Sequence, residues 1–98
     1  MHSRLTTTVL APDEPESASE IVEAILPMMR ELSGFKGVIV LHDDERRLNV
    51  AMTLWENAEA LQASEAVMGK IRAAETNTRH VESQVTSTFR VVACHLER

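Results

Sequence analysis

The chain has 98 residues, a hydrophobic fraction of 44% and a formal net charge of −5 at pH 7 with histidine neutral. This length suits one domain, so we expect residues 1–98 to fold as a single unit that buries about 60 to 65% of its unfolded surface. Lysine and arginine are scattered along an acidic chain. Nucleic acid and anionic membrane surfaces are therefore excluded as partners, because binding them needs a concentration of positive charge.

The cysteine content and the hydropathy indicate a compartment. A single cysteine, Cys94, rules out an internal disulfide framework and is typical of a reducing environment. The first ten residues lack the continuous apolar run of a secretory signal, and no stretch reaches the ~20 apolar residues that span a bilayer. We expect a soluble cytoplasmic protein.

The first third of the chain predicts a strand followed by a helix. Residues 4–10 have the β-branched content of a strand, and the proline-rich residues after them indicate a loop. Ser17 and Glu20 have the spacing of a capping box, so a helix is expected to begin here. Pro27 is expected to bend this helix, and Gly34 to end it in the left-handed conformation. Its inward stripe comprises Ala18, Ile21, Val22, Ile25, Leu26, Met29 and Leu32.

Two strands joined by a charged connector are expected next. They are residues 36–42 and 47–55, and residues 43–46 between them have the length of a hairpin connection. Side chains alternate between the two faces of a strand. The first of these strands is apolar on both faces, with Val38 and Val40 opposite Ile39 and Leu41. The second has a wholly apolar face of Leu48, Val50, Met52 and Leu54, opposite a face of Asn49, Ala51, Thr53 and Trp55.

The last part of the chain predicts a second helix and a fourth strand. Asn57 can cap the helix, which fades around residues 75–77. Residues 81–96 alternate and are rich in Val, Thr and Ser, which indicates a strand long enough to contain a bulge. The inward helix stripe comprises Ala60, Leu61, Ser64, Val67, Met68 and Ile71, while Gln62, Lys70 and Arg72 are expected nearer to water.

The order strand, helix, strand, strand, helix, strand is that of the α+β ferredoxin-like fold, βαββαβ. In this fold a four-stranded antiparallel sheet carries both helices on one face. The other face would expose a larger apolar patch than monomers usually tolerate. A second copy packed against it would cover the patch, and each buried Leu or Met would contribute roughly 1.5 to 3 kcal/mol. We therefore expect a two-fold homodimer with an interface of Leu48, Val50, Met52 and Leu54.

Two short motifs carry a resemblance to a known family. They are Gly34-Phe35-Lys36-Gly37 and the stretch Thr53-Leu54-Trp55-Glu56-Asn57-Ala58-Glu59-Ala60. These resemble the dimeric α/β-barrel superfamily and, within it, the antibiotic biosynthesis monooxygenase (ABM) domain. The resemblance covers most of the chain in element order. It implies a dimeric α/β barrel of ABM-like domains, an oxidoreductase chemistry, and a ligand held between the helices and the sheet of each subunit.

Trp55 is the first candidate catalytic residue. Ala51 and Thr53 on the same strand face are small, so they leave room for a pocket beneath the helices into which the indole N–H can donate. Met29 and Met68 would line that pocket, either as adaptable core packing or against a flat hydrophobic ligand. The alternative for Trp55 is a core side chain that closes the helix layer.

Asn49 and His80 are the other candidate catalytic residues. In the cofactor-free oxygenases that the chain resembles, a deprotonated aromatic substrate passes an electron to oxygen in a dry cavity with donors placed where negative charge develops. Those oxygenases carry an Asn four residues before the Trp, where this chain has Ala51. Asn49 lies on the same strand face, one step further away. His80 follows the second helix, and histidine suits proton transfer near neutral pH.

Haem, other cofactors and metal ions are not expected. The haem-degrading branch has an Asn in the first strand and a His near the end of the second helix, and the corresponding places here hold Ser3 and Ala74. Only His80 remains as a substitute ligand. Cys94 and His95 are adjacent on a predicted strand and point to opposite faces, so they cannot readily share an ion. No ligand spacing such as His-x-x-x-His relates the remaining candidates, His42, His80 and His95.

Two functions stay open at this point. The first is a cofactor-independent monooxygenase-like protein that acts on a small aromatic or quinol-type molecule in a helix–sheet pocket. The second is a small-ligand-binding or structural dimer of the same fold without chemistry, which the missing Asn and the lack of a paired acid and base favour. The substrate and its pathway do not follow from the sequence.

Overall fold

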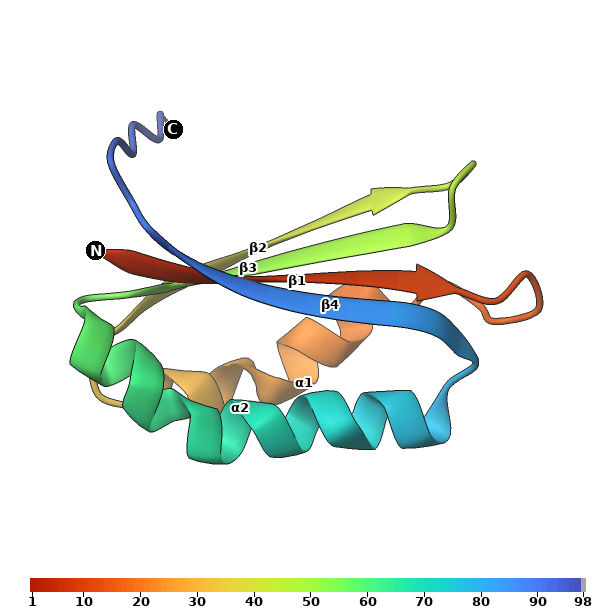
Figure 1. Cartoon of the computed structure of the whole chain (residues 1–98), viewed down its shortest axis with the longest axis horizontal. Helices are drawn as coiled ribbons and strands as arrows, with labels where there is room; N and C mark the ends of the chain where they lie inside the picture. The colour runs from red at the N-terminus through yellow and green to blue at the C-terminus, as the bar shows by residue number, and fades with distance from the viewer. Residues whose placement is uncertain (98) are drawn as a thin grey trace.

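The computed structural model describes residues 1–97, and the predicted βαββαβ order is confirmed. The elements are β1 (His2–Leu10), α1 (Ala18–Glu31), β2 (Phe35–Asp43), β3 (Leu48–Trp55), α2 (Ala58–Thr78) and β4 (Val81–Arg90). Figure 1 shows the strands as one layer and both helices as a second layer on one side of it. The fold is therefore the α+β ferredoxin-like arrangement expected from the sequence.

The sheet has the strand order β2-β3-β1-β4, and each neighbouring pair is antiparallel. The two central strands, β1 and β3, pair along almost their whole length, from His2 opposite Trp55 to Val9 opposite Leu48. The pairing of β1 with β4 shifts between Val9 and Leu10, which leaves one extra residue in β4. The predicted bulge in the last strand therefore lies at its beginning.

Helix α1 begins where expected, but not through the predicted capping box. The Ser17 hydroxyl makes no capping hydrogen bond within residues 1–97. Instead the carboxylate of Glu16 accepts a hydrogen bond from the Ala18 N–H at 2.5 Å. Glu16 thus supplies the acceptor for a free N–H at this helix end. The helix continues through Pro27 as one element, as predicted.

The turn after α1 contains the one left-handed glycine in the described part of the chain. The helix ends at Glu31, with Leu32 in an extended conformation as its last capping residue. Gly34 follows with a φ of +79°. The left-handed conformation of Gly34 was predicted, although Gly34 lies two residues beyond the cap rather than in it.

Helix α2 begins at the predicted cap and runs slightly further than expected. The Asn57 side chain accepts a hydrogen bond from the Ala60 N–H at 2.8 Å. The helix ends at Thr78 rather than around residues 75–77. Hydroxyl groups near this end donate to carbonyls of the preceding turn, Thr76 to Ala73 at 3.0 Å and Thr78 to Ala74 at 2.8 Å.

The fourth strand is shorter than predicted. It ends at Arg90, and residues 91–97 have no regular secondary structure instead of continuing the strand to Leu96. Its pairing with β1 ends where His2 lies opposite Arg90. One further backbone hydrogen bond joins the Val91 N–H to the Met1 carbonyl at 2.8 Å.

The two faces of the sheet differ in how well they are covered. The face below the helices packs on a core cluster of Met29, Trp55, Leu61 and Met68, each at most 7% exposed. On the opposite face, Leu41 is 57%, Val85 61% and Phe89 51% exposed. That face also carries Leu48, Val50, Met52 and Leu54, as expected from the alternation along β3. Among the described residues, no helix has the length and apolar character needed to cross a membrane.

Candidate functional site

A pocket of about 90 Å³ lies between the two helices and the sheet. Its apolar wall comes from the helices and the edge strand and includes Ile21, Val22, Ile25, Val40 and Ile71. Its polar floor comes from the inward faces of β1 and β3, where alternation places Thr6, Thr8, Asn49 and Thr53. The four residues predicted to line a pocket all do so: Met29, Ala51, Thr53 and Met68. The chain thus forms a small enclosure with an apolar roof and hydroxyl and amide groups on its floor.

Trp55 lies in the core next to this pocket. Its side chain is fully buried, and its ring meets Phe35 edge-on with 5.5 Å between the ring centroids. The indole N–H donates to the Thr53 hydroxyl at 3.0 Å. Thr53 itself lines the pocket, so Trp55 holds the Thr53 hydroxyl from the neighbouring position on the same strand face. This position corresponds to the packing interpretation of Trp55, and a direct catalytic role stays a prediction.

Asn49 is held in one orientation by a chain of polar contacts. Its side chain is at the pocket floor, and the residue is 6% exposed. The Asn49 Oδ1 lies 2.5 Å from Nδ1 of His42, its partner across the β2–β3 pair. An amide oxygen only accepts, so His42 Nδ1 donates in this pair. His42 Nε2 lies 3.1 Å from a carboxylate oxygen of the exposed Asp44, a contact that becomes a hydrogen bond only when Nε2 carries a hydrogen as well. Because Oδ1 is occupied, the Asn49 NH₂ group remains as a donor for the pocket.

Two arginines at one end of the pocket were not anticipated. Arg4 is 4% exposed, and Arg72, which was expected nearer to water, lines the same pocket with its side chain 18% exposed. Both guanidinium groups contact the carboxylate of Glu65 on the outer side of α2. The Arg72 side chain is mostly buried and reaches the pocket although its helix position lies beside the apolar stripe, which the stripe alone does not reveal. The sequence did contain an indication that Arg4 faces the pocket, since Arg4 alternates with Thr6 and Thr8 on one face of β1.

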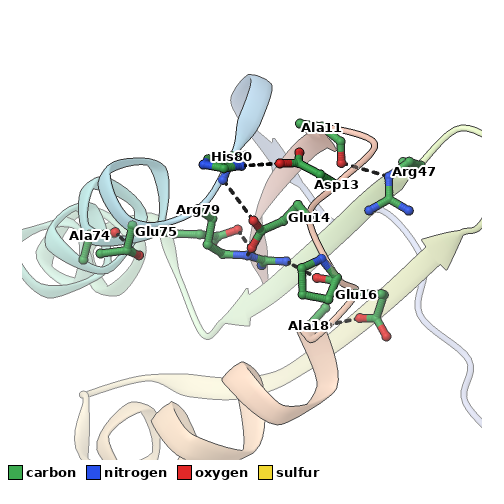
Figure 2. Close-up of polar contacts among 12 residues, drawn as sticks. Ala11, Asp13, Glu14, Glu16, Ala18, Arg47, Ala74, Glu75, Arg79 and His80 are labelled. Atoms are coloured by element: carbon green, nitrogen blue, oxygen red, sulfur yellow. Dashed lines mark hydrogen bonds and ion pairs between the residues drawn. The ribbon is translucent and has the colours of Figure 1, made fainter.

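A clasp at the other end of the pocket joins the β1–α1 loop to the end of α2 (Figure 2). The Arg79 guanidinium donates to the Glu14 carboxylate at 3.0 Å and to the Pro15 carbonyl at 3.1 Å. Hydrogen bonds from Arg79 and from the His80 backbone N–H hold the pKa of Glu14 below its ordinary value. Burial raises the pKa of Glu75, which lies 3.5 Å from Arg79 and lines the pocket.

The remaining candidates lie away from the pocket floor. The imidazole of His80 is 71% exposed and pairs with Asp13 at 2.9 Å on the outside of the clasp. Ser3 is buried at 5% and pairs with Leu54 in the sheet, whereas Ala74 is exposed on α2. Cys94 is exposed. Within residues 1–97, no three His, Cys, Asp or Glu side chains are grouped so that they could hold a metal ion.

Neither a protein-family model nor a curated protein sequence matches the chain. Solved structures do match. A proposed antibiotic biosynthesis monooxygenase from Deinococcus radiodurans is 14% identical with a TM-score of 0.74, and the match covers 100% of this chain and 99% of that one. A monooxygenase from Streptomyces coelicolor in complex with nanaomycin D is 15% identical with a TM-score of 0.73, over 99% of this chain and 92% of that one. A cofactor-independent oxygenase from Streptomyces nogalater is 16% identical with a TM-score of 0.66, over 98% and 97%. The chain therefore has the fold of the ABM domain, as its motifs suggested.

Proposed function

We propose that this protein is a monooxygenase-like enzyme that acts, without a cofactor, on a small aromatic or quinol-type molecule in the helix–sheet pocket. The observation that carries the proposal is the pocket floor, where the contact with His42 leaves the amide NH₂ group of Asn49 free to donate opposite the apolar side chains of the helices. The fold is shared with a cofactor-independent oxygenase, which supports the same reading.

The chemistry requires little from the protein beyond this arrangement. A quinol ring loses a hydroxyl proton, the resulting anion passes one electron to O₂, and the two radicals combine at a ring carbon to form a peroxide, which takes up a proton. Loss of water from this hydroperoxide leaves a carbonyl group, so one hydrogen of the water comes from the ring carbon, the other from the hydroxyl group, and its oxygen is the second oxygen atom of O₂. The substrate supplies all the electrons. A donor near the developing anion stabilises it strongly, because few water molecules compete in an apolar enclosure.

The size of the pocket limits the substrate. An apolar cavity of roughly 150 Å³ accommodates one benzene ring. With about 90 Å³ available, this pocket cannot enclose a single ring completely, and it accommodates a tricyclic molecule still less well. We therefore favour a one-ring substrate over an anthrone.

We further propose that two copies pair through the open face of the sheet. The register places Leu41 beside Val50 and Ile39 beside Met52, so the exposed side chains of β2 continue the apolar surface of β3. Val85 and Phe89 extend it on β4, where both are more than half exposed. Apolar side chains gathered on one face of β2, β3 and β4 are typical of a surface that contacts another protein chain.

A binding or structural dimer without chemistry is the second candidate. It is favoured by the position of Asn49, which lies six residues before Trp55 instead of four, and by Ala51 at the place of the expected amide. In this case the pocket would bind a ligand and leave it unchanged.

Oxygen uptake separates the two candidates. Purified protein is mixed with a panel of hydroquinones and anthrones in an oxygen electrode, and Asn49→Ala is compared with Asn77→Ala, which removes an exposed amide from α2. Loss of one donor of this kind reduces turnover by roughly 10²- to 10³-fold. Uptake that Asn77→Ala preserves and Asn49→Ala abolishes supports the enzyme. Equal uptake by both variants, or none by any form, contradicts it.

A further inference from the structure

The pocket end formed by Arg4 and Arg72 holds more positive charge than its surroundings balance. Arg4 is fixed by three contacts: Nη1 donates to the Ser64 hydroxyl at 3.1 Å, and Nη2 donates to the Leu61 carbonyl at 2.8 Å and pairs with Glu65 at 3.0 Å. Glu65 also pairs with Arg72. Two guanidinium groups therefore share one carboxylate, which is itself half exposed to water.

Arg72 has an unused donor at this place. Its Nη2 contacts Glu65, but its Nη1 is buried and has no hydrogen-bond partner among residues 1–97. Buried donors almost always have an acceptor, and leaving a charged one without any is especially costly. A negatively charged ligand in the adjoining pocket would supply the missing acceptor.

The electrostatic surroundings of Arg4 agree with this picture. Burial lowers the pKa of Arg4, Glu65 raises it, and the neighbouring charge of Arg72 lowers it. At the opposite end, Arg79 already has two carboxylates, those of Glu14 and Glu75. The Arg4–Arg72 end therefore has one excess positive charge and the Arg79 end one excess negative charge, so an anion is favoured at the Arg4–Arg72 end alone.

We propose that Arg4 and Arg72 bind the carboxylate of a small aromatic acid whose ring lies against Met68 and Ile71. This rests on the proposed function and narrows its substrate to a ring that carries a carboxylate. Guanidinium groups match the planar geometry of a carboxylate in paired hydrogen bonds. A single excess charge suits a monoanion, whereas a phosphate dianion would remain under-compensated in a mostly apolar pocket.

The proposal is tested by calorimetric titration with benzoate and with benzamide, its neutral analogue of nearly the same shape. Benzoate is expected to bind at least tenfold more tightly than benzamide. Arg72→Gln should remove this preference and leave benzamide binding within threefold of wild type. Arg30→Gln is the matched control, because Arg30 is exposed on α1.

A second variant should shift the affinity in the opposite direction. Glu65→Gln removes the carboxylate that both arginines share, so it should tighten benzoate binding several-fold and leave benzamide unchanged. A purely structural role for the ion pairs predicts weaker binding of both probes. Equal binding of benzoate and benzamide, failure of both to bind, or a preference that Arg72→Gln does not reduce would overturn the proposal.

These titrations are independent of turnover. Selective benzoate binding without oxygen uptake from any quinol would remove the proposed chemistry and keep the carboxylate site. Oxygen uptake that is equal for neutral and carboxylated quinols, and unaffected by Arg72→Gln, would remove the carboxylate site and keep the chemistry.

Discussion

Replacement of Gly34 by alanine tests the turn between α1 and β2, which lies against the start of α2. The Gly34 carbonyl accepts a hydrogen bond from the Glu56 N–H at 2.7 Å, which joins the start of β2 to the chain between β3 and α2. Gly34 has a φ of +79°, and an added Cβ would lie 2.5 Å from the Cβ of Ala60 and 3.4 Å from that of Glu56. Gly34→Ala therefore introduces backbone strain and a steric clash at once.

The two costs can be estimated separately. A non-glycine residue in the left-handed region costs about 1 to 2 kcal/mol. Forcing a methyl group into a filled space costs about 1 to 3 kcal/mol, and the Cβ of Ala60 is held on α2 and cannot simply rotate away. We expect Gly34→Ala to lower the free energy of unfolding by roughly 2 to 5 kcal/mol. Gly37 is the matched control, since a Cβ there meets only the Leu54 side chain at 3.9 Å.

Urea unfolding, followed by the fluorescence of Trp55 and by far-UV circular dichroism, measures both variants. Gly37→Ala should remain within about 1 kcal/mol of the wild type. Adding Ala60→Gly to Gly34→Ala should relieve the clash but not the strain, so part of the loss should be recovered relative to Ala60→Gly alone. If Gly34→Ala were as stable as Gly37→Ala, the close approach of this turn to α2 would be refuted.

Three further changes test other parts of the structure. In analytical ultracentrifugation, we expect the wild type to sediment as a dimer and Leu41→Asp as a folded monomer, because the substitution places a charge on the apolar face. A wild-type protein that is monomeric at high concentration would refute the dimer. Trp55→Phe should lower the free energy of unfolding by roughly 1 to 3 kcal/mol, because the hydrogen bond to Thr53 is lost and the ring is smaller. Its affinity for benzoate should stay within threefold of the wild type. Lost affinity with unchanged stability would argue for direct contact between Trp55 and the ligand. Glu14→Gln should destabilise the protein at pH 7, where Glu14 is ionised against Arg79, and should do so less at pH 3. Because the pKa of Glu14 is lowered in the folded protein, ionised Glu14 stabilises the fold above the ordinary glutamate pKa, and this stabilisation disappears as the pH falls through the lowered pKa. An equal loss of unfolding free energy at both pH values would speak against the clasp.

Much of the fold follows from sequence periodicity because alternation and helical spacing directly record which face is covered. Strand β3 is the clearest example, with Asn49 and Thr53 under the helices and Leu48 and Val50 on the open face. The cap at Asn57 was equally predictable, since its side chain has the right acceptor at the right spacing. These features are local, and local sequence is sufficient for them.

The structure differs from the sequence-based predictions where another side chain or a partner strand overrides the local pattern. Ser17 has the sequence of a cap, but the Glu16 carboxylate reaches the helix end instead. The last strand ends at Arg90, where its pairing with β1 ends opposite His2, and the composition of residues 91–96 does not record the extent of that pairing. Arg72 was expected in water because its place on the helix is beside the apolar stripe, yet a long side chain turns toward the charge of Glu65.

The most direct test of the pocket as the ligand site is a methyl NMR titration with a one-ring quinol. Strand β2 provides its own control, because Val38 and Val40 line the pocket while their neighbours Ile39 and Leu41 lie on the open face. We expect the valine methyl resonances to shift in a saturable manner while those of Ile39 and Leu41 stay in place. Shifts confined to Ile39 and Leu41, or none at all at millimolar ligand, would contradict a binding site between the helices and the sheet.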